Sequence, residues 1–492
     1  MKRLELVVLL FILVFGFLVR LYRLDNPIAD WHQWRQADTS AVSRNFVKEG
    51  LDLFHPKFDD ISNIASGRDN PLGYRFVEFP IYNFFQAETY KNLGFFTLEE
   101  WGRLVSIFSS ILTAIFLYLI IKKNSGYIEG ILSAFFFLFL PFSVYFSRTI
   151  LPDEMMVASI LGGIYFFDKW LTHNVILRPK AEESRGGSFA SLRMTTFYIL
   201  AIVFTASSLL LKPYAIFFTL PMIYLAWKRF GFSFLKKWQL WIFLILSVIP
   251  LAIWRIWMQQ YPEGIPASSW LFNANDIRFK GSFFYWIFAD RIARLILGYF
   301  GVVFLVLGFF RKEAEKDYFL SFSFLASSLL YIFVIAAGNV QHDYYQILII
   351  PTVSIFLARG IAFILFLKNK ENKIISYILI PTLVISMLSF SWYFVRDYFN
   401  VNNWSIVEAG KKADEVLPKD AKIIVPYDGD TAFLYQTNRR GWPAFEKPIE
   451  ELIQMGASYL VIANPTKNDF SGFGKQYETV ASSPSYLILK LK

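Results

Sequence analysis

The eighteen residues LVSIFSSILTAIFLYLII, from Leu104 to Ile121, carry no charged side chain and end directly before Lys122 and Lys123. A helix needs about 20 mostly apolar residues to cross the hydrocarbon core of a bilayer. The stretch therefore predicts a transmembrane helix with its basic end at one membrane surface. This prediction sets the class of the whole protein.

Apolar stretches of the same kind recur along the 492-residue chain. They predict a mainly α-helical, polytopic membrane protein with about eleven transmembrane helices, a count that shifts by one if a short stretch does not cross. Arg20 and Arg23 follow the first stretch without a small-residue cleavage site, so we expect an uncleaved anchor. The predicted helices are Leu6–Val19, Leu104–Ile121, Ile128–Phe146, Met155–Phe167, Thr196–Leu211, Tyr214–Trp227, Leu240–Trp257, Leu295–Phe310, Tyr318–Ala337, Ile347–Leu367 and Ile374–Phe394.

The composition supports a membrane protein and excludes several other classes. Hydrophobic residues make up 55%, aromatic residues 19% and charged residues only 18% of the chain, and the mean hydropathy is +0.41. Disordered, collagen-like and coiled-coil chains need fewer aromatic residues, a strict glycine period or far more charge. The chain has no cysteine, which excludes disulfides, thiolate metal centres and cysteine nucleophiles.

The net charge of +10 indicates orientation. If the N-terminus is cytoplasmic, the basic pairs Lys122–Lys123, Lys228–Arg229 and Lys236–Lys237 all fall on the cytoplasmic side, where such residues accumulate in membrane proteins. An even number of helices would break this alternation. We therefore expect a multi-pass protein of the plasma membrane with a cytoplasmic N-terminus, and no nucleic-acid partner is needed to explain the charge.

Two segments fall on the opposite, outer side. A long first outer loop, about residues 20–100, belongs to a predicted membrane domain of residues 1–395. The tail, residues 396–492, predicts a small extracytoplasmic α/β domain. Its helix-like runs are Ile406–Val416 and Pro448–Met455, and its strand-like runs are Lys422–Val425, Tyr459–Ile462 and Tyr486–Leu491. On the cytoplasmic side, residues 178–193 are rich in serine, glycine and charge and predict a disordered insert.

Charged side chains at the outer surface mark a candidate site, because polar groups at the edge of a bilayer are costly. In the sequence WRQADT, Asp38 follows Arg35, and it either caps an amphipathic helix beginning at Thr39 or acts as a general base. In VEFPIY, Glu78 either favours the N-terminus of a helix running to Leu93 or joins the site. We expect both helices to lie along the membrane surface.

Two further motifs lie at outer turns between predicted helices. SRTILPDE places Arg148 before the adjacent carboxylates Asp153 and Glu154, and Asp153 either caps a helix or belongs to a polar site. In LKPY, Lys212 either extends to the membrane surface, as lysines near helix ends do, or faces a cavity together with Tyr214.

The last motif is NVQHDYY, which contributes His342, Asp343 and Tyr345. These residues either belong to an aromatic belt at the membrane surface or join the same outer cavity. Arg255, at the outer end of the seventh predicted helix, could join them. The sequence contains no phosphate-binding glycine loop, no G-x-S-x-G nucleophile elbow and no H-E-x-x-H zinc motif that would indicate a soluble enzyme.

The motifs WRQADT, EFPIY, SRTILPDE, LKPY and HDYYQ, in this order on one face of a chain with about eleven spans, resemble the GT-C superfamily of membrane glycosyltransferases. The resemblance is to the bacterial branch related to protein O-mannosyltransferases and to lipid A aminoarabinose transferases. It covers residues 1 to about 394 and extends weakly to Asp428–Asp430 and Arg439–Trp442. Each motif is unspecific alone, and five in this order make the likeness moderately specific.

The resemblance implies the transfer of a sugar from a polyprenyl-phosphate carrier to a glycan, lipid or protein acceptor on the outer side of the membrane. It implies that Asp38 is the catalytic aspartate of the first loop and that Asp153 and Glu154 are an acidic pair. Lys212, His342 and Arg255 then contact the carrier phosphate. The remaining residues expected to bind substrate are Arg35, Arg75, Glu78, Arg148, Tyr214, Asp343 and Tyr345.

One position departs from the pattern. In the aminoarabinose transferases a lysine follows the glutamate of the second motif, and Phe79 stands there in this chain. The resemblance therefore implies that Arg75 or Lys212 supplies the missing phosphate contact. It does not carry over the identity of the sugar or of the acceptor.

The expected reaction needs a base for the acceptor hydroxyl and positive charge for the departing phosphate. Direct displacement at the anomeric carbon inverts its configuration. A divalent metal ion held by Asp38, Glu78 and Asp153 is a further possibility that the sequence leaves open. Two other classes remain alternatives, namely a secondary transporter, for which no internal repeat is visible, and a membrane scaffold whose tail binds a partner.

Overall fold

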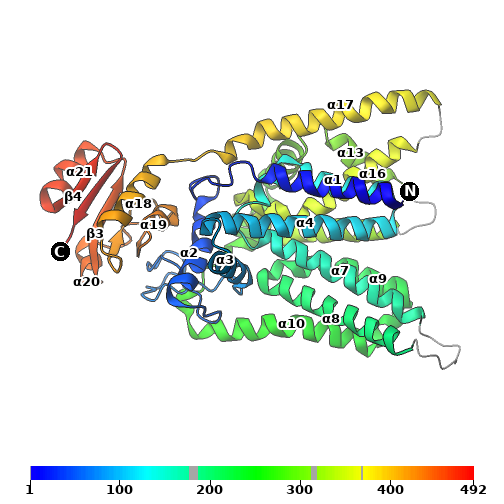
Figure 1. The fold of residues 1–492 in the computed structure, drawn as a ribbon, viewed down its shortest axis with the longest axis horizontal. Coiled ribbons are helices and arrows are strands. Elements are labelled where there is room, and N and C mark those ends of the chain that lie inside the picture. The colour runs from blue at the N-terminus through cyan, green and yellow to red at the C-terminus, as the bar shows by residue number, and fades with distance from the viewer. Residues whose placement is uncertain (1, 177–186, 312–317, 367–369) are drawn as a thin grey trace.

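Long helices lying side by side form most of the protein (Figure 1). The computed structural model describes residues 2–176, 187–311, 318–366 and 370–492. The N-terminus lies at one end of the helices, and a small region with a β-sheet lies beyond the other end. The long helices are α1 (Lys2–Arg20), α4 (Leu98–Asn124), α5 (Tyr127–Phe139), α7 (Asp153–Ile176), α8 (Gly187–Leu211), α9 (Leu220–Phe230), α10 (Trp238–Trp257), α13 (Val302–Phe310), α14 (Tyr318–Val334), α16 (Ile350–Leu365) and α17 (Lys370–Val395).

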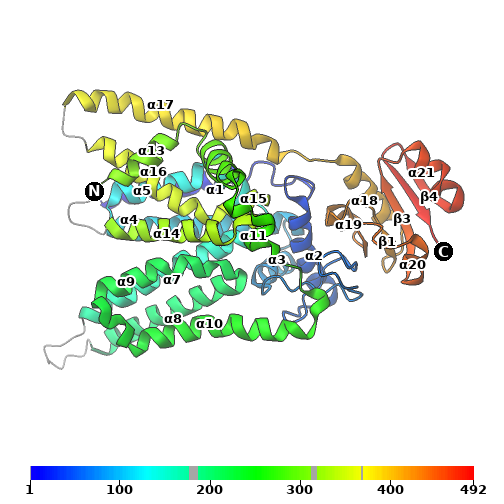
Figure 2. The same cartoon turned by 180° about the vertical axis from the view of Figure 1, so that it is seen from behind.

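Shorter helices connect and cap these (Figure 2). The α-helical ones are α6 (Pro141–Phe146), α11 (Trp270–Asn273), α12 (Gly281–Phe284) and α15 (Ala336–Gln341). A π-helical segment, η6, spans Tyr285–Ile296. The 3-10 segments are η1 (Pro213–Thr219), η2 (Gly231–Lys236), η3 (Met258–Gln260), η4 (Pro262–Gly264), η5 (Ala274–Phe279), η7 (Asp343–Ile349) and η8 (Arg396–Phe399).

Within the described residues, four helical segments are long and apolar enough to cross a membrane by length and composition. They are Leu98–Asn124, Trp238–Gln260, Asp343–Leu365 and Ser376–Val416. The shorter apolar helices are Tyr127–Phe139, Thr195–Leu211 and Phe319–Val334. Every predicted span overlaps one or two helices in its described residues, and the count of eleven crossings stays a prediction.

Three predicted spans are broken where the sequence indicates single helices; one of them, Tyr318–Ala337, divides at Ile335 between α14 and α15. The stretch Ile128–Phe146 divides at Leu140, because Pro141 lacks the N–H that would continue α5 and instead starts α6. The stretch Leu295–Phe310 divides at Gly298, whose φ is 48°. A Cβ on Gly298 would lie 2.3 Å from the carbonyl oxygen of Met387, so this turn also allows α17 to approach closely.

The prediction of a disordered insert at residues 178–193 is wrong for its last seven residues, because α8 begins at Gly187. Ala190 and Leu192 in that segment are strong helix formers. The rest of the predicted insert, residues 178–186, lies outside the described residues.

The first outer loop contains α2 (Gln33–Glu49) and α3 (Ile81–Leu93). α2 begins six residues before Thr39, with His32 at its N-cap position, so the interpretation of Asp38 as a helix cap is wrong. Most of its polar side chains are buried and form hydrogen bonds within the protein; Gln86 of α3, for example, bonds to Ser40 and Ser43. α2 is therefore a buried polar helix and not an amphipathic helix on the membrane surface.

The C-terminal region contains a five-stranded sheet, and three of its strands coincide with the three predicted strand-like runs. Its order is β2-β1-β3-β5-β4, with β1 parallel to β2 and β3, and β5 antiparallel to β3 and β4. The short strand β2 and the largely exposed strand β4 were not predicted, because neither shows a clear apolar alternation. The elements are α18 (Trp404–Val416), β1 (Lys422–Ile424), α19 (Thr431–Gln436), β2 (Arg440–Trp442), α20 (Ile449–Gln454), β3 (Ala457–Ala463), α21 (Lys467–Ser471), α22 (Phe473–Gln476), β4 (Glu478–Ser483) and β5 (Tyr486–Lys490).

The first outer loop pairs with the edge of this sheet. The N–H of Gly441 in β2 donates to the carbonyl of Asp59, and the carbonyl of Gly441 accepts from the N–H of Ile61, both at 3.0 Å. Ile61 packs in the same hydrophobic cluster as Trp442 and Leu460. Loop and C-terminal region therefore pack as one unit at the end of the helices.

Candidate active site

A cavity of about 500 Å³ lies between the first outer loop, the ends of the helices and the C-terminal region. Nine of the residues singled out in the sequence line it. They are Arg35, Asp38, Arg75, Glu78, Lys212, Tyr214, Arg255, His342 and Tyr345. The structure therefore brings residues from five separate segments of the chain to one place.

Asp38 is held on both carboxylate oxygens. Arg75 donates from Nη2 to Oδ2 at 2.6 Å, and the hydroxyl of Thr431 donates to Oδ1 at 2.7 Å. The side chain of Asp38 is only 4% exposed. The cation and the second donor replace the water that this carboxylate loses on burial.

Arg35 and Glu78 form a second buried ion pair on the cavity wall. Nη2 of Arg35 lies 2.6 Å from Oε1 and 2.9 Å from Oε2 of Glu78. Glu78 lies before Pro80, outside α3, so its main contact is this arginine and not the helix terminus. At Phe79, where the resembling enzymes have a lysine, the ring packs edge-on against Trp254 and brings no positive charge.

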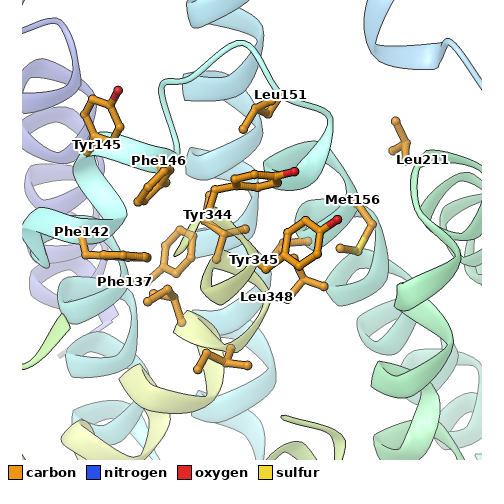
Figure 3. Close-up of a cluster of buried hydrophobic side chains, with 14 of the residues drawn as sticks. Phe137, Phe142, Tyr145, Phe146, Leu151, Met156, Leu211, Tyr344, Tyr345 and Leu348 are labelled. Atoms are coloured by element: carbon orange, nitrogen blue, oxygen red, sulfur yellow. The ribbon is translucent and has the colours of Figure 1, made fainter. Parts of the chain in front are cut away.

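Lys212 lies at the turn between α8 and η1, and its ammonium group donates to Oδ1 of Asp153 at 2.7 Å. The group also lies 5.3 Å and 5.2 Å from the ring centres of Tyr344 and Tyr345. Both partners of the ion pair are buried, so the alternative that Lys212 extends to the membrane surface is wrong. Figure 3 shows these two tyrosines within a cluster of buried side chains that includes Phe146 and Leu348.

Four predicted site residues do not line the cavity, namely Arg148, Asp153, Glu154 and Asp343. Glu154, the neighbour of Asp153, is buried and accepts a hydrogen bond from Thr113 at 2.7 Å. Arg148 donates to the carbonyl of Arg23 and lies over the ring of Phe399. The adjacent carboxylates Asp153 and Glu154 diverge because successive residues on a helix point about 100° apart.

Asp343 also lies away from the cavity and joins three segments of the chain. It accepts from the ring nitrogen Nε2 of His32 at 2.5 Å, from Trp31 Nε1 at 3.0 Å and from the hydroxyl of Tyr398 at 2.8 Å. His32 has a φ of 57°, the left-handed conformation that starts α2. Asp343 therefore fixes the beginning of the helix that carries Arg35 and Asp38.

His342 lies among aromatic rings at the cavity. Its ring centre lies 5.7 Å from that of Trp34, 5.6 Å from that of Trp270 and 5.5 Å from that of Tyr344. Burial, together with the nearby His32, lowers the pKa of His342 to about 4. The imidazole is therefore neutral at pH 7, and the positive charge expected of it is absent.

Several residues that line the cavity are not indicated by the sequence motifs, among them Asp60, Trp270 and Thr431. Asp60 is 3% exposed and accepts from the N–H of Ser62 at 2.8 Å. Among the described residues it forms no ion pair, and burial together with the charge of Asp38 raises its pKa to about 6. No short motif surrounds Asp60, and the docking of the loop on β2 brings it to the cavity.

The carboxylates proposed for a divalent metal do not converge. Asp38, Glu78 and Asp153 each bind a different cationic side chain. In the part of the chain that the structure describes, no group of three or more His, Asp or Glu side chains is arranged to hold a metal ion.

Comparisons with known proteins define the fold. The sequence matches no protein-family model and none of the curated proteins searched. In structure, the chain is similar to ArnT from Cupriavidus metallidurans bound to undecaprenyl phosphate, with a TM-score of 0.63 and 11% identity over 98% of this chain and 97% of that one.

A second similar structure is the archaeal oligosaccharyltransferase AglB from Archaeoglobus fulgidus, in complex with an inhibitory peptide and a dolichol-phosphate. Its TM-score is 0.54, with 10% identity over 94% of this chain and 70% of that one. ArnT and AglB are both GT-C proteins, so the fold that the five motifs led us to expect is confirmed.

Proposed function

We propose that the protein is an integral membrane glycosyltransferase that moves a sugar from a polyprenyl-phosphate donor to an acceptor hydroxyl. The observation that carries this proposal is the cavity, where the carboxylate of Asp38 and the cations Arg35, Arg75, Lys212 and Arg255 lie together at one end of the helices. A lipid-phosphate sugar needs both kinds of group. The similar ArnT structure has undecaprenyl phosphate bound, which supports a lipid-phosphate donor.

The reaction we propose is a single displacement. The acceptor oxygen forms a bond to the anomeric carbon of the sugar, and the bond from that carbon to the phosphate oxygen breaks, leaving its electron pair on the phosphate. The acceptor proton goes to the carboxylate of Asp38, and the configuration inverts. General-base catalysis of this kind contributes about 10²- to 10⁴-fold in rate.

The cations have different roles in this proposal. Arg75, Arg35 and Lys212 each share their charge with a carboxylate, so they orient Asp38, Glu78 and Asp153. Arg255 lines the cavity and forms no ion pair among the described residues; its contact is the sulfur of Met258 at 3.9 Å. We assign Arg255 to the carrier phosphate, because a preorganised cation stabilises the departing phosphate charge.

The orientation is part of the proposal. We place the N-terminus in the cytoplasm and the cavity and the C-terminal domain, residues 396–492, on the outer side, with about eleven crossings. The basic pairs at Lys122, Lys228 and Lys236 support this orientation. The N-terminus and the sheet lie at opposite ends of the helices, which agrees with an odd number of crossings (Figure 1).

The test is transfer of radiolabel from a panel of polyprenyl-phosphate sugars by the purified full-length protein, with membranes from a strain lacking the gene as the acceptor. We expect one donor to lose its label to the acceptor fraction, and Asp38→Asn to abolish this transfer. Asp52→Asn, the same change on an exposed side chain of the same loop, is the matched control. An intact sugar–phosphate bond with every donor, or full activity of Asp38→Asn, contradicts the proposal.

A further inference from the structure

The carboxylate of Asp38 is held from two directions by segments far apart in the sequence. Arg75 belongs to the first outer loop, and Thr431 is the first residue of α19 in the C-terminal region. The hydroxyl of Thr431 is buried, and the residue lines the cavity. The C-terminal region therefore reaches the residue that we propose as the base.

The contact with Asp38 is the preferred hydrogen bond of this hydroxyl. Thr431 Oγ1 lies 2.7 Å from Oδ1 of Asp38 and 3.2 Å from the carbonyl oxygen of Trp34. A hydroxyl has one proton to donate, and a bond to a charged carboxylate is shorter and about twice as strong as one to a neutral carbonyl. The proton of Thr431 therefore points to Asp38.

The turn before α19 holds Thr431 in place. Asp430 accepts from the N–H of Ala432 at 2.8 Å, which caps α19, and its second oxygen accepts from Gln33 of α2 at 2.9 Å. Gly429, with a φ of 81°, turns the chain at the cavity edge. The backbone that carries Thr431 is thus anchored to the same helix that carries Asp38.

The two donors leave Asp38 free to react. Each carboxylate oxygen has two lone pairs, and Arg75 and Thr431 occupy one on each. The remaining lone pairs can take the acceptor proton, while the two donors prevent the carboxylate from rotating away from the cavity. Removing either donor leaves the group held on one oxygen only.

We propose that Thr431 is a positioning residue of the active site, through which the C-terminal region fixes the carboxylate of Asp38 for proton transfer. This inference rests on the proposed function, because it requires Asp38 to be the base. It predicts that the C-terminal region contributes to the chemical step itself and not only to the stability of the protein.

The test compares Thr431→Val, which keeps the shape of the side chain and removes the hydroxyl, with Thr431→Ser, which keeps the hydroxyl. We expect Thr431→Val to lower kcat about 10- to 100-fold with little change in KM for the labelled polyprenyl-phosphate sugar. Thr431→Ser should restore most of kcat. Thr437→Val is the matched control, because Thr437 is buried at the end of α19 and its hydroxyl donates to the carbonyl of Leu434 at 2.6 Å.

A measurement of folding separates positioning from misfolding. Thr431→Val should lower kcat per folded protein, with the folded fraction measured by thermal unfolding in detergent, whereas Thr437→Val should leave kcat per folded protein unchanged. If Thr431→Val aggregates, Thr431→Ala and Thr431→Ser provide the same comparison. The inference is overturned if Thr431→Val has the same kcat as wild type, or if Thr431→Ser does not restore kcat. In that case the proposed function still stands, provided that the wild-type protein transfers the sugar. Wild-type protein that transfers no sugar overturns both.

Discussion

The ammonium group of Lys212 and the carboxylate of Asp153 lie 2.7 Å apart, and both side chains are almost completely buried. Lys212 follows α8, and Asp153 is the first residue of α7, so the ion pair joins two neighbouring long helices at the edge of the cavity. The rings of Tyr344 and Tyr345 cover the lysine. The pair therefore links the packing of the helices to the shape of the proposed site.

Breaking this pair on one side should destabilise the protein strongly. Lys212→Met leaves the carboxylate of Asp153 buried without a partner, which costs about 3–5 kcal/mol in comparable pairs. The double variant Lys212→Met with Asp153→Leu should recover a large part of that loss, since it leaves no uncompensated charge. Thermal unfolding of the purified protein in detergent measures the stability of each variant. If the double variant loses as much stability as the two single variants together, the buried-pair account is contradicted.

Arg255 should affect donor binding more than stability. Because no described carboxylate neutralises it, Arg255→Gln removes positive charge from the cavity without stranding a buried partner. A hydrogen bond to a charged group contributes about 1.5–3 kcal/mol, so we expect KM for the polyprenyl-phosphate sugar to rise about 10- to 100-fold. Arg396→Gln, at an exposed arginine next to Asp397, is the control, and an unchanged KM for Arg255→Gln rejects the phosphate contact.

Glu446 should make the packing of the C-terminal region depend on pH. Burial and the nearby charge of Asp60 raise the pKa of Glu446 to about 7 in the folded protein, compared with about 4.3 in an unfolded chain. The unfolded state therefore releases this proton first, and the folded state loses stability as the pH rises from about 4 to about 7.

Glu446→Gln should remove this loss of stability at high pH. Because Glu446 is partly exposed, water screens much of the unfavourable effect of its charge. We therefore expect the Tm of Glu446→Gln to exceed that of wild type by only a few degrees at pH 8, and not at pH 4.5. Glu450→Gln, at an exposed position nearby, should show no such difference. Equal effects of Glu446→Gln at the two pH values would show that its charge does not matter.

The orientation can be tested cleanly because the chain has no cysteine. Ser471 in α21 and Ser233 in η2 are exposed, and the proposal places them on opposite sides of the membrane. A membrane-impermeant maleimide should label Ser471→Cys in intact cells and Ser233→Cys only after permeabilisation. The reverse pattern would invert the topology.

Local sequence patterns predicted most of the helical architecture. Hydrophobic stretches predicted the positions of the helices, because an apolar run of sufficient length has few alternatives to burial in lipid or in a helical core. α2 was placed too late because it is polar on all sides, so no apolar period marks its start at Gln33. β2 was missed because a strand of three residues, Arg440–Trp442, is too short for alternation to be visible.

The sequence by itself determined that this is a helical membrane protein and that polar motifs gather at turns between its helices, because hydrophobicity and turn residues act locally. Only the tertiary structure decided which of those residues meet. Thr431 reaches Asp38 across 393 positions of the chain, and Asp60 reaches the cavity because its loop pairs with Gly441. Contacts of this kind depend on the docking of distant segments and on the direction of each side chain around its helix, and a linear pattern specifies neither.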